Sequence, residues 1–370
     1  MQNPFNYTSI VGGISFCNRQ KEKKEVLNFI INSQNVLLYS QRRYGKTSLI
    51  FEVFKKARRS RPKIDTMHID LYGTLSEREF VAAILSGLSQ IESKAERLVN
   101  LLKNTLRNIK LGWSIDPISG APSGISVSFE SGYNETMLDN VMGLLEKLSR
   151  KRKLVVVFDE FQEIANYGKI GFEKRLRKHV QLHKNICYIF CGIQSQIINE
   201  IFNNQNRAFY KMAAHYPIEK IGTAYYLRWA AKLFAKNNIA FESEILEDVI
   251  FRCENHPMYI QQFFYFLWDE PEVTPESLNK IEHKILQRHY NEFLNLWDSL
   301  TPNQKKTLKL IVSTGGKEIF YANAIQSVDL KSGSQITRAL EVLVKKDIVY
   351  KTKNYQIQDI MFKKWIQTLL

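Results

Sequence analysis

The sequence predicts a three-layer α/β domain with a parallel β-sheet, followed by a helical domain and a small domain of helices and one hairpin. Two observations carry this prediction. Up to residue 222, short apolar runs rich in β-branched residues alternate with amphipathic helical patterns. From residue 223 the strand-like runs disappear and helical patterns follow one another. At 370 residues the chain is also long enough for two or three domains.

The first domain opens with a strand and a helix. VLLYS at 36–40 predicts the strand, and 47–59 predicts a helix with a basic C-terminal end that suits the helix dipole. A second strand is expected at 64–73. Ser76 and Glu79 then form a capping-box pattern ahead of a helix that ends near residue 92.

An insertion and two more strands complete this domain. Residues 110–130 alternate polar and apolar side chains around a Gly/Pro/Ser turn, which predicts a β-hairpin. A helix at 134–149 precedes LVVVF at 154–158, whose continuous apolar character is typical of a buried parallel strand. A basic helix at 170–183 leads to the strand at 186–192.

The rest of the chain predicts a helical domain and a winged helix-turn-helix. Three successive helical patterns and a linking helix at about 276–298 form the helical domain. Thr301 then caps a helix with Pro302 at its first position. Three helices followed by a hairpin, at 302–313, 319–327, 333–346 and 348–358, give the order of a winged helix. The expected domains are 1–222, 223–295 and 296–370.

The net charge and the composition indicate which partners and which cellular compartment to expect. The formal net charge is +15, which is typical of proteins that bind phosphate-rich partners and equally compatible with lysine-rich faces that only keep the chain in solution. Neither a signal peptide nor an apolar stretch of about 18 residues is present, so no membrane is expected as a partner. Four scattered cysteines without metal-type spacing favour a reducing compartment, and we expect a cytoplasmic protein.

The stretch YSQRRYGKTSLI at 39–50 has the features of a phosphate-binding loop between a strand and a helix. Gly45 lets the backbone turn, Lys46 reaches the β- and γ-phosphates, and the Thr47 hydroxyl binds Mg²⁺. Ser40 replaces the first glycine of the usual pattern, at a cost of roughly 1 kcal/mol if its φ is positive. The residues expected to bind nucleotide here are Gln41, Arg42, Arg43, Tyr44, Gly45, Lys46, Thr47 and Ser48.

A second motif, VVVFDE at 155–160, is an apolar strand that ends in two carboxylates. Asp159 would hold Mg²⁺ through water, and Glu160 would act as general base on the attacking water. The alternative is a buried strand with two acids at its exposed end, which the phosphate-loop motif after an earlier strand makes less favoured. We expect Lys46 and the two acids to meet at the ends of adjacent strands.

Several polar residues are candidates for supporting roles. Gln194, with Ser195, follows the strand at 186–192 and is a candidate catalytic contact to the γ-phosphate, although Ile193 stands where a polar residue would be convenient. Arg42 and Arg43 contact phosphate, a neighbouring subunit or only solvent. Arg207 and Lys211 supply a trans-acting positive charge in a homo-oligomer, or they belong to a solvated loop, which is the favoured alternative.

Together these motifs resemble the prokaryotic AAA+-type ATPases of the archaeal ATPase group, relatives of the origin-recognition and STAND NTPases. The resemblance extends over nearly the whole chain and is most specific in RRYGKTS and VFDEFQE. The chain departs from the family pattern at Ser40, Ile193, Lys211 and Asn255. The resemblance implies a P-loop NTPase fold with a three-layer parallel sheet, a helical lid and a C-terminal winged helix, and it implies ATP and Mg²⁺ as ligands.

The resemblance also assigns roles outside the two motifs. It places Asn18 and Arg19 near the adenine or ribose, because they match the family's N-R pair. It makes His256 and Pro257 of the segment NHPMYIQQ the lid residues that contact the nucleotide and report its state.

The C-terminal segment is a candidate interface for double-stranded DNA. Residues 300–370 hold 12 Lys/Arg and 5 Asp/Glu, a net charge of +7, and the expected recognition helix is 333–346. The alternative is that the winged helix packs on the ATPase core or on a protein partner. The candidate DNA contacts are Gln335, Thr337, Arg338, Lys351 and Lys353.

Three functions fit these observations. The first is an ATP-hydrolysing switch whose lid and winged helix transmit the nucleotide state to DNA or to a protein. The second is a DNA-binding winged-helix protein whose nucleotide site binds ATP without hydrolysing it. The third is a protein-interaction scaffold.

Overall fold

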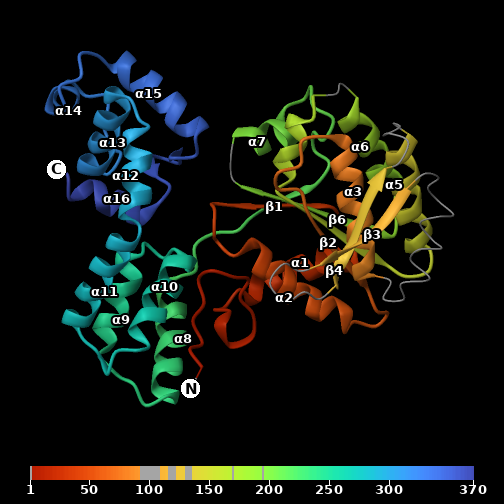
Figure 1. Ribbon diagram of the computed structural model, residues 1–370, viewed down its shortest axis with the longest axis horizontal. Helices are drawn as coiled ribbons and strands as arrows, with labels where there is room; N and C mark the ends of the chain where they lie inside the picture. Colours follow the sequence, from red (N-terminus) through yellow and green to blue (C-terminus); the bar gives the residue numbers. More distant parts are fainter. Residues whose placement is uncertain (1, 92–108, 116–121, 130–135, 169–170, 194–195) are drawn as a thin grey trace. The chain divides into compact units, whose positions relative to one another are not determined.

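The structure is a computed structural model that describes residues 2–91, 109–115, 122–129, 136–168, 171–193 and 196–370 (Figure 1). The chain divides into two compact units, which are Ile10–Glu219 and Met1–Ser9 together with Lys220–Leu370. The proposed three-domain division stays a prediction. In the described part of the chain, no helix is both long and apolar enough to cross a membrane.

The first unit is built on a five-stranded sheet. Four of its strands lie where the sequence predicts them, and all of the pairings are parallel. The fifth, β7, pairs with β1 and was not predicted, because the four residues of AHYP do not form a continuous apolar run. In the order β2-β5-β6-β1-β7, the strands are β2 (Asp65–Asp70), β5 (Leu154–Asp159), β6 (Ile186–Ile193), β1 (Val36–Ser40) and β7 (Ala214–Pro217).

One expectation about this sheet is wrong. The strand before the phosphate loop, β1, is not adjacent to the strand that carries the two acids, β5, because β6 lies between them. The chain leaves β5, crosses through the helix α6 (Phe172–Leu182) and returns at the central position of the sheet. Residues from β1 and β5 can therefore meet only by reaching across the end of β6.

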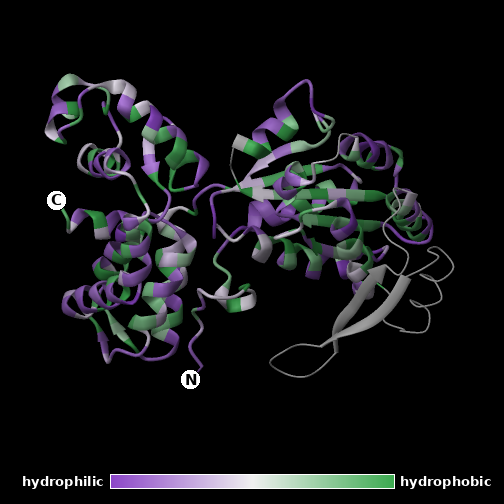
Figure 2. Cartoon of the chain, turned by 45° about the horizontal axis from the view of Figure 1, so that its top comes forward, coloured by the Kyte–Doolittle hydropathy of each residue, from purple (hydrophilic) through white to green (hydrophobic). Residues whose placement is uncertain are grey.

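Helices cover both faces of the sheet, which gives the expected three layers (Figure 1). Successive side chains of the strands enter opposite cores, as Val155 and Val157 do on one face and Val156 and Phe158 on the other. The central strands β5 and β6 are accordingly buried along their whole length and mostly hydrophobic (Figure 2). On one face lie α1 (Gln20–Ile31) and α2 (Lys46–Arg58), and on the other α3 (Glu77–Gly87), α5 (Thr136–Ser149), α6 and α7 (Gln196–Asn203).

Two local predictions in this unit are confirmed in their main features. The insertion forms an antiparallel hairpin of β3 (Ile109–Ile115) and β4 (Pro122–Phe129). The Ser76 hydroxyl accepts a hydrogen bond from the Glu79 N–H at 3.3 Å, so Ser76 caps α3. The Glu79 carboxylate turns back to the Leu75 N–H rather than to the cap residue itself.

The second unit begins with helices, as predicted, and also includes the N-terminal residues. Phe5 is 1% exposed, and its ring lies 5.1 to 5.7 Å from the rings of Trp229, Phe234, Phe264 and Trp268. The expected linking helix is two helices that break at His289. The helices are α8 (Thr223–Lys236), α9 (Ser243–Arg252), α10 (Pro257–Leu267), α11 (Pro275–Arg288) and α12 (Tyr290–Asp298), with β8 (Ala240–Phe241) paired to β9 (Glu272–Val273).

The winged helix occupies the C-terminal part of this unit. It has one helix that was not predicted, α16 (Ile360–Gln367), which Asp359 caps by accepting a hydrogen bond from the Phe362 N–H at 2.9 Å. The predicted elements are present as α13 (Pro302–Thr314), α14 (Ala322–Ser327), α15 (Gly333–Lys345), β10 (Val349–Lys351) and β11 (Tyr355–Ile357).

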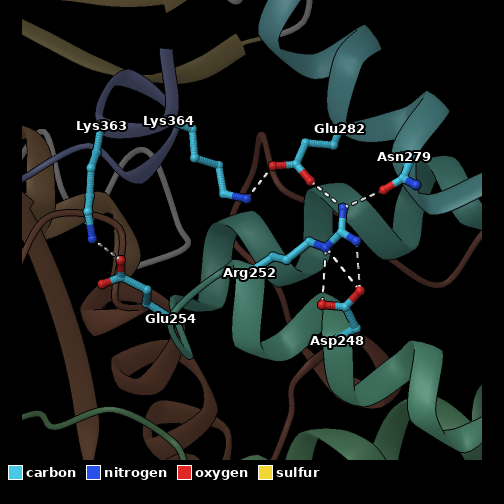
Figure 3. A network of polar contacts seen from close by, with 7 residues as sticks. All are labelled: Asp248, Arg252, Glu254, Asn279, Glu282, Lys363 and Lys364. Atoms are coloured by element: carbon cyan, nitrogen blue, oxygen red, sulfur yellow. Dashed lines mark hydrogen bonds and ion pairs between the residues drawn. The ribbon is translucent and has the colours of Figure 1, made fainter. Parts of the chain in front are cut away.

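A network of charged side chains joins α16 to the helices before it (Figure 3). Lys363 pairs with Glu254 at 2.7 Å, and Lys364 pairs with Glu282. Glu282 also pairs with Arg252 of α9 at 2.6 Å. The winged helix and the helices α9 and α11 are thus held to each other by charge as well as by packing.

Candidate functional site

The phosphate-binding loop links β1 to α2, and its backbone turns at two left-handed residues. These are Arg43, with φ 57°, and Gly45, with φ 82°. Ser40 is the last residue of β1, so it does not adopt the positive φ that the glycine comparison suggested. The expected strain at Ser40 is absent, and its hydroxyl donates a hydrogen bond to the Gln41 carbonyl at 2.8 Å.

The Lys46 side chain folds back into this loop and is 7% exposed. Its ammonium makes only long contacts with residues that the structure describes, 3.4 Å to the Ser40 hydroxyl and 3.5 Å to the Gln41 carbonyl. Burial lowers the pKa of Lys46, while the charges of Glu160 and Asp159 oppose that shift. A buried cation held by weak neutral contacts is suited to an anionic ligand that supplies stronger ones.

Thr47 and Asp159 meet although they lie 112 residues apart in the sequence. The Thr47 hydroxyl donates to Asp159 Oδ2 at 2.9 Å, and the Glu160 N–H donates to Asp159 Oδ1 at 3.1 Å. His68 Nε2 lies 3.1 Å from the same Oδ2. Burial opposes ionisation of this carboxyl, but the hydrogen bonds from His68 and Thr47 and the charge of Lys46 hold its pKa below the ordinary value. Asp159 is therefore an anion beside a hydroxyl, a pair of oxygen donors that fits Mg²⁺.

Glu160 follows directly, in a left-handed conformation with φ 52°. The next residues form the short helix η3 (Phe161–Asn166), in which Gln162 Nε2 donates to Glu160 Oε2. Burial raises the pKa of Glu160, and the Gln162 hydrogen bond and the Lys46 charge partly counter it. A carboxylate with a raised pKa is better suited to accept a proton from water.

Comparisons with known proteins show which families and solved structures the chain resembles. Residues 291–368 match a family model described as a probable winged helix domain. The whole chain is similar to the solved structure of the Walker-type ATPase PABY2304 of Pyrococcus abyssi, with a TM-score of 0.69 over 98% of this chain and 99% of that one, at 14% identity. No curated protein matches the sequence.

The fold is that of an AAA+-type P-loop ATPase with a C-terminal winged helix. Two further solved structures share it. The Aeropyrum pernix ORC2 protein, in ADPNP–ADP complexes, has a TM-score of 0.57 at 13% identity and covers 100% of this chain and 98% of that one. The Aeropyrum pernix ORC1 protein in complex with DNA has a TM-score of 0.53 at 11% identity, over 98% and 94%.

The other candidate residues of the first unit include two that are not described and three arginines. Gln194 and Ser195 lie outside the described residues. Arg42 and Arg43 are exposed in the loop. Arg207 lies in the turn after α7 and makes ion pairs with Glu173 and, at 3.1 Å, with Glu200 of its own chain, and a trans-acting role for it stays a prediction.

Asn18 and Arg19 precede α1 in two consecutive left-handed conformations, with φ 55° and 64°. Arg19 is 3% exposed, and its guanidinium donates to Glu22 at 2.7 Å. This ion pair explains why an arginine and a glutamate three residues later occur together at the start of α1. A contact of either residue with adenine or ribose stays a prediction.

His256 and Pro257, which the family resemblance assigns to a lid, lie in the second unit, and their contact with nucleotide stays a prediction. Pro257 is the first residue of α10, and the buried His256 ring lies 4.9 Å from the Tyr259 ring. Asn255, which replaces the family's glycine, has φ 59°, a conformation that asparagine tolerates. Its amide donates to the Ile221 carbonyl at 2.9 Å and to the Thr223 hydroxyl at 3.1 Å, so the replacement is well accommodated.

The candidate DNA contacts lie on two elements of the winged helix. Thr337 and Arg338 are exposed on α15, and Lys351 and Lys353 are exposed on the hairpin. Gln335 is half-buried, and its side-chain oxygen accepts a hydrogen bond from the Lys331 N–H at 2.8 Å. Two residues were missed entirely, His68 and Gln162, because a single histidine in a strand and a glutamine after two acids carry no spacing signal.

Proposed function

We propose that the chain is an ATP-dependent switch, which binds ATP with Mg²⁺ at the phosphate loop and hydrolyses it slowly. The observation that carries this proposal is the hydrogen bond between the Thr47 hydroxyl and the Asp159 carboxylate, with Lys46 and Glu160 beside them. The similarity to a Walker-type ATPase and to an ORC2 protein in ADPNP–ADP complexes supports the choice of nucleotide.

Each residue then has a defined task. Lys46 binds the β- and γ-phosphate oxygens, and the N–H groups of the loop and of the start of α2 surround the phosphates. Thr47 and Asp159 would hold Mg²⁺, which neutralises the charge that develops on the transferring phosphoryl group. Glu160 accepts a proton from the water whose oxygen bonds to the γ-phosphorus as the bond to ADP breaks.

The charged network in the second unit supports the coupling step of this proposal (Figure 3). Glu254, which pairs with Lys363 of α16, lies two residues before His256. If His256 contacts nucleotide, as the family resemblance implies, a shift of this segment would move α16 through the Glu254–Lys363 pair. The winged helix would then respond to the state of the nucleotide.

Lys46→Met is expected to weaken binding of Mg·ATP by about 10- to 100-fold, because it removes a charge-assisted contact to phosphate. Binding of a fluorescent ATP analogue to the intact chain measures the change. Lys55→Met, on the exposed side of the same helix, is the matched control and should bind like wild type. Equal affinities of wild type and Lys46→Met would contradict a phosphate site at this loop.

DNA is the partner that the second unit supports best. The net charge of the C-terminal segment and the similarity to an ORC1 protein in complex with DNA favour it over a protein. Base contacts come from the exposed face of α15, and phosphate contacts come from the hairpin.

Arg338→Ala is expected to weaken binding of the full chain to its preferred duplex by about 5- to 150-fold, and Lys353→Ala to reduce the salt slope of binding by about one. Fluorescence anisotropy over a series of salt concentrations measures both. Lys236→Ala, an exposed lysine of α8, is the control. No binding at low salt, or identical binding by all variants, would assign the winged helix to a protein partner instead.

A further inference from the structure

The side chain of Gln162 contacts the general base that the proposed function requires. It lies in η3, two residues after Glu160, and its Nε2 donates a hydrogen bond to Glu160 Oε2. Among the described residues, the other carboxylate oxygen of Glu160 has no hydrogen-bond partner. One oxygen of the base is therefore fixed, and the other remains available to a water molecule.

The oxygen of the Gln162 side-chain amide fixes the orientation of that amide. Gln162 Oε1 is buried without a hydrogen-bond partner in the described structure. It lies only 2.8 Å from the position that a Cβ would occupy at Gly192, so the glycine at the end of β6 leaves the space for it. With the oxygen packed against Gly192, the NH₂ group faces the carboxylate, which is the only attractive arrangement toward an anionic Glu160.

Leaving a buried carbonyl oxygen unpaired is unfavourable, and such groups are uncommon in folded proteins. Here the arrangement directs the opposite NH₂ donor to Glu160. The backbone of Glu160 is also constrained, since it is left-handed and its N–H donates to Asp159 Oδ1 at 3.1 Å. Both the main chain and the carboxylate of Glu160 are thus restrained by neighbours that lie outside the phosphate loop.

We infer that Gln162 is a positioning residue for ATP hydrolysis, which holds Glu160 so that its second oxygen faces the attacking water. This inference rests on the proposed function. Gln162 makes no contact with nucleotide in this role; it acts through Glu160. A small displacement of a catalytic base is enough to lower a rate by one or two orders of magnitude.

Gln162→Met tests the inference, because methionine has nearly the same length and lacks the amide donor. The expected result is a 10- to 100-fold fall in kcat for ATP with a KM within twofold of wild type and an unchanged unfolding temperature. In the Glu160→Gln background the same substitution should cause no further loss, because its effect passes through the carboxylate. If Gln162→Met does not fold, Gln162→Asn serves in its place, since its amide is one methylene too short to reach.

A kcat within twofold of wild type, or equal losses in the wild-type and Glu160→Gln backgrounds, would overturn the inference while leaving the proposed function intact. A wild-type chain that binds ATP but shows no turnover would overturn the proposed hydrolysis and this inference together. The two failures are thus distinguished by the wild-type rate alone.

Discussion

Glu160→Gln is expected to lower the rate of ATP hydrolysis by about 100- to 10,000-fold while leaving ATP binding close to wild type. Glutamine keeps the size of the side chain but cannot accept the proton of the attacking water. In the proposed site the phosphates are held by Lys46 and the loop, which the substitution does not alter. Phosphate release under steady-state conditions, together with an ATP titration, separates the two effects.

The matched control for this prediction is Glu163→Gln, which removes a half-buried carboxylate three residues further along η3. It should hydrolyse ATP at a rate within about twofold of wild type. If wild type and Glu160→Gln turn over ATP equally slowly while both bind it, the chain is a nucleotide-binding protein without hydrolysis, the alternative that the departures from the family pattern left open.

The second large effect concerns stability rather than chemistry. Phe5→Ala is expected to destabilise the second unit by about 3–5 kcal/mol, because it empties a fully buried site among four aromatic rings. Urea unfolding followed by tryptophan fluorescence reports the loss, since Trp229 and Trp268 are two of those rings.

Phe251→Ala is the control for Phe5, since Phe251 lies in the same unit and is 81% exposed. Its free energy of unfolding should stay within about 0.5 kcal/mol of wild type. A loss below about 1 kcal/mol for Phe5→Ala would show that the N-terminal residues do not belong to the core of the second unit.

The parts of the fold that sequence reasoning predicted are those with a local signal. The strand at 36–40 was placed at its observed bounds because an apolar run ends abruptly at the polar loop. The two site motifs were found for the same reason, since each is a continuous segment. The strand β7 was missed because it is only four residues long and lacks a continuous apolar run, and α16 was missed although its apolar residues do follow a helical pattern over eight residues.

What the sequence could not provide is the arrangement of distant segments. The position of β6 between β1 and β5 depends on how the chain crosses the sheet, and no local pattern records it. His68 and Asp159, which are in contact, lie 91 positions apart in the sequence. Phe5 packs against aromatic rings that lie more than 200 positions away. Ser40 and Asn255 are conspicuous as replaced glycines in the sequence, yet their backbone conformations suit serine and asparagine.

A crystal structure of the chain grown with Mg²⁺ and ADPNP is the most direct test of the central claim. The claim predicts the triphosphate in contact with the Lys46 ammonium, and the metal between it and the Thr47–Asp159 pair, with Glu160 facing the γ-phosphate. A nucleotide bound away from these residues, or a phosphate loop filled by the protein's own side chains in the presence of ADPNP, would contradict it.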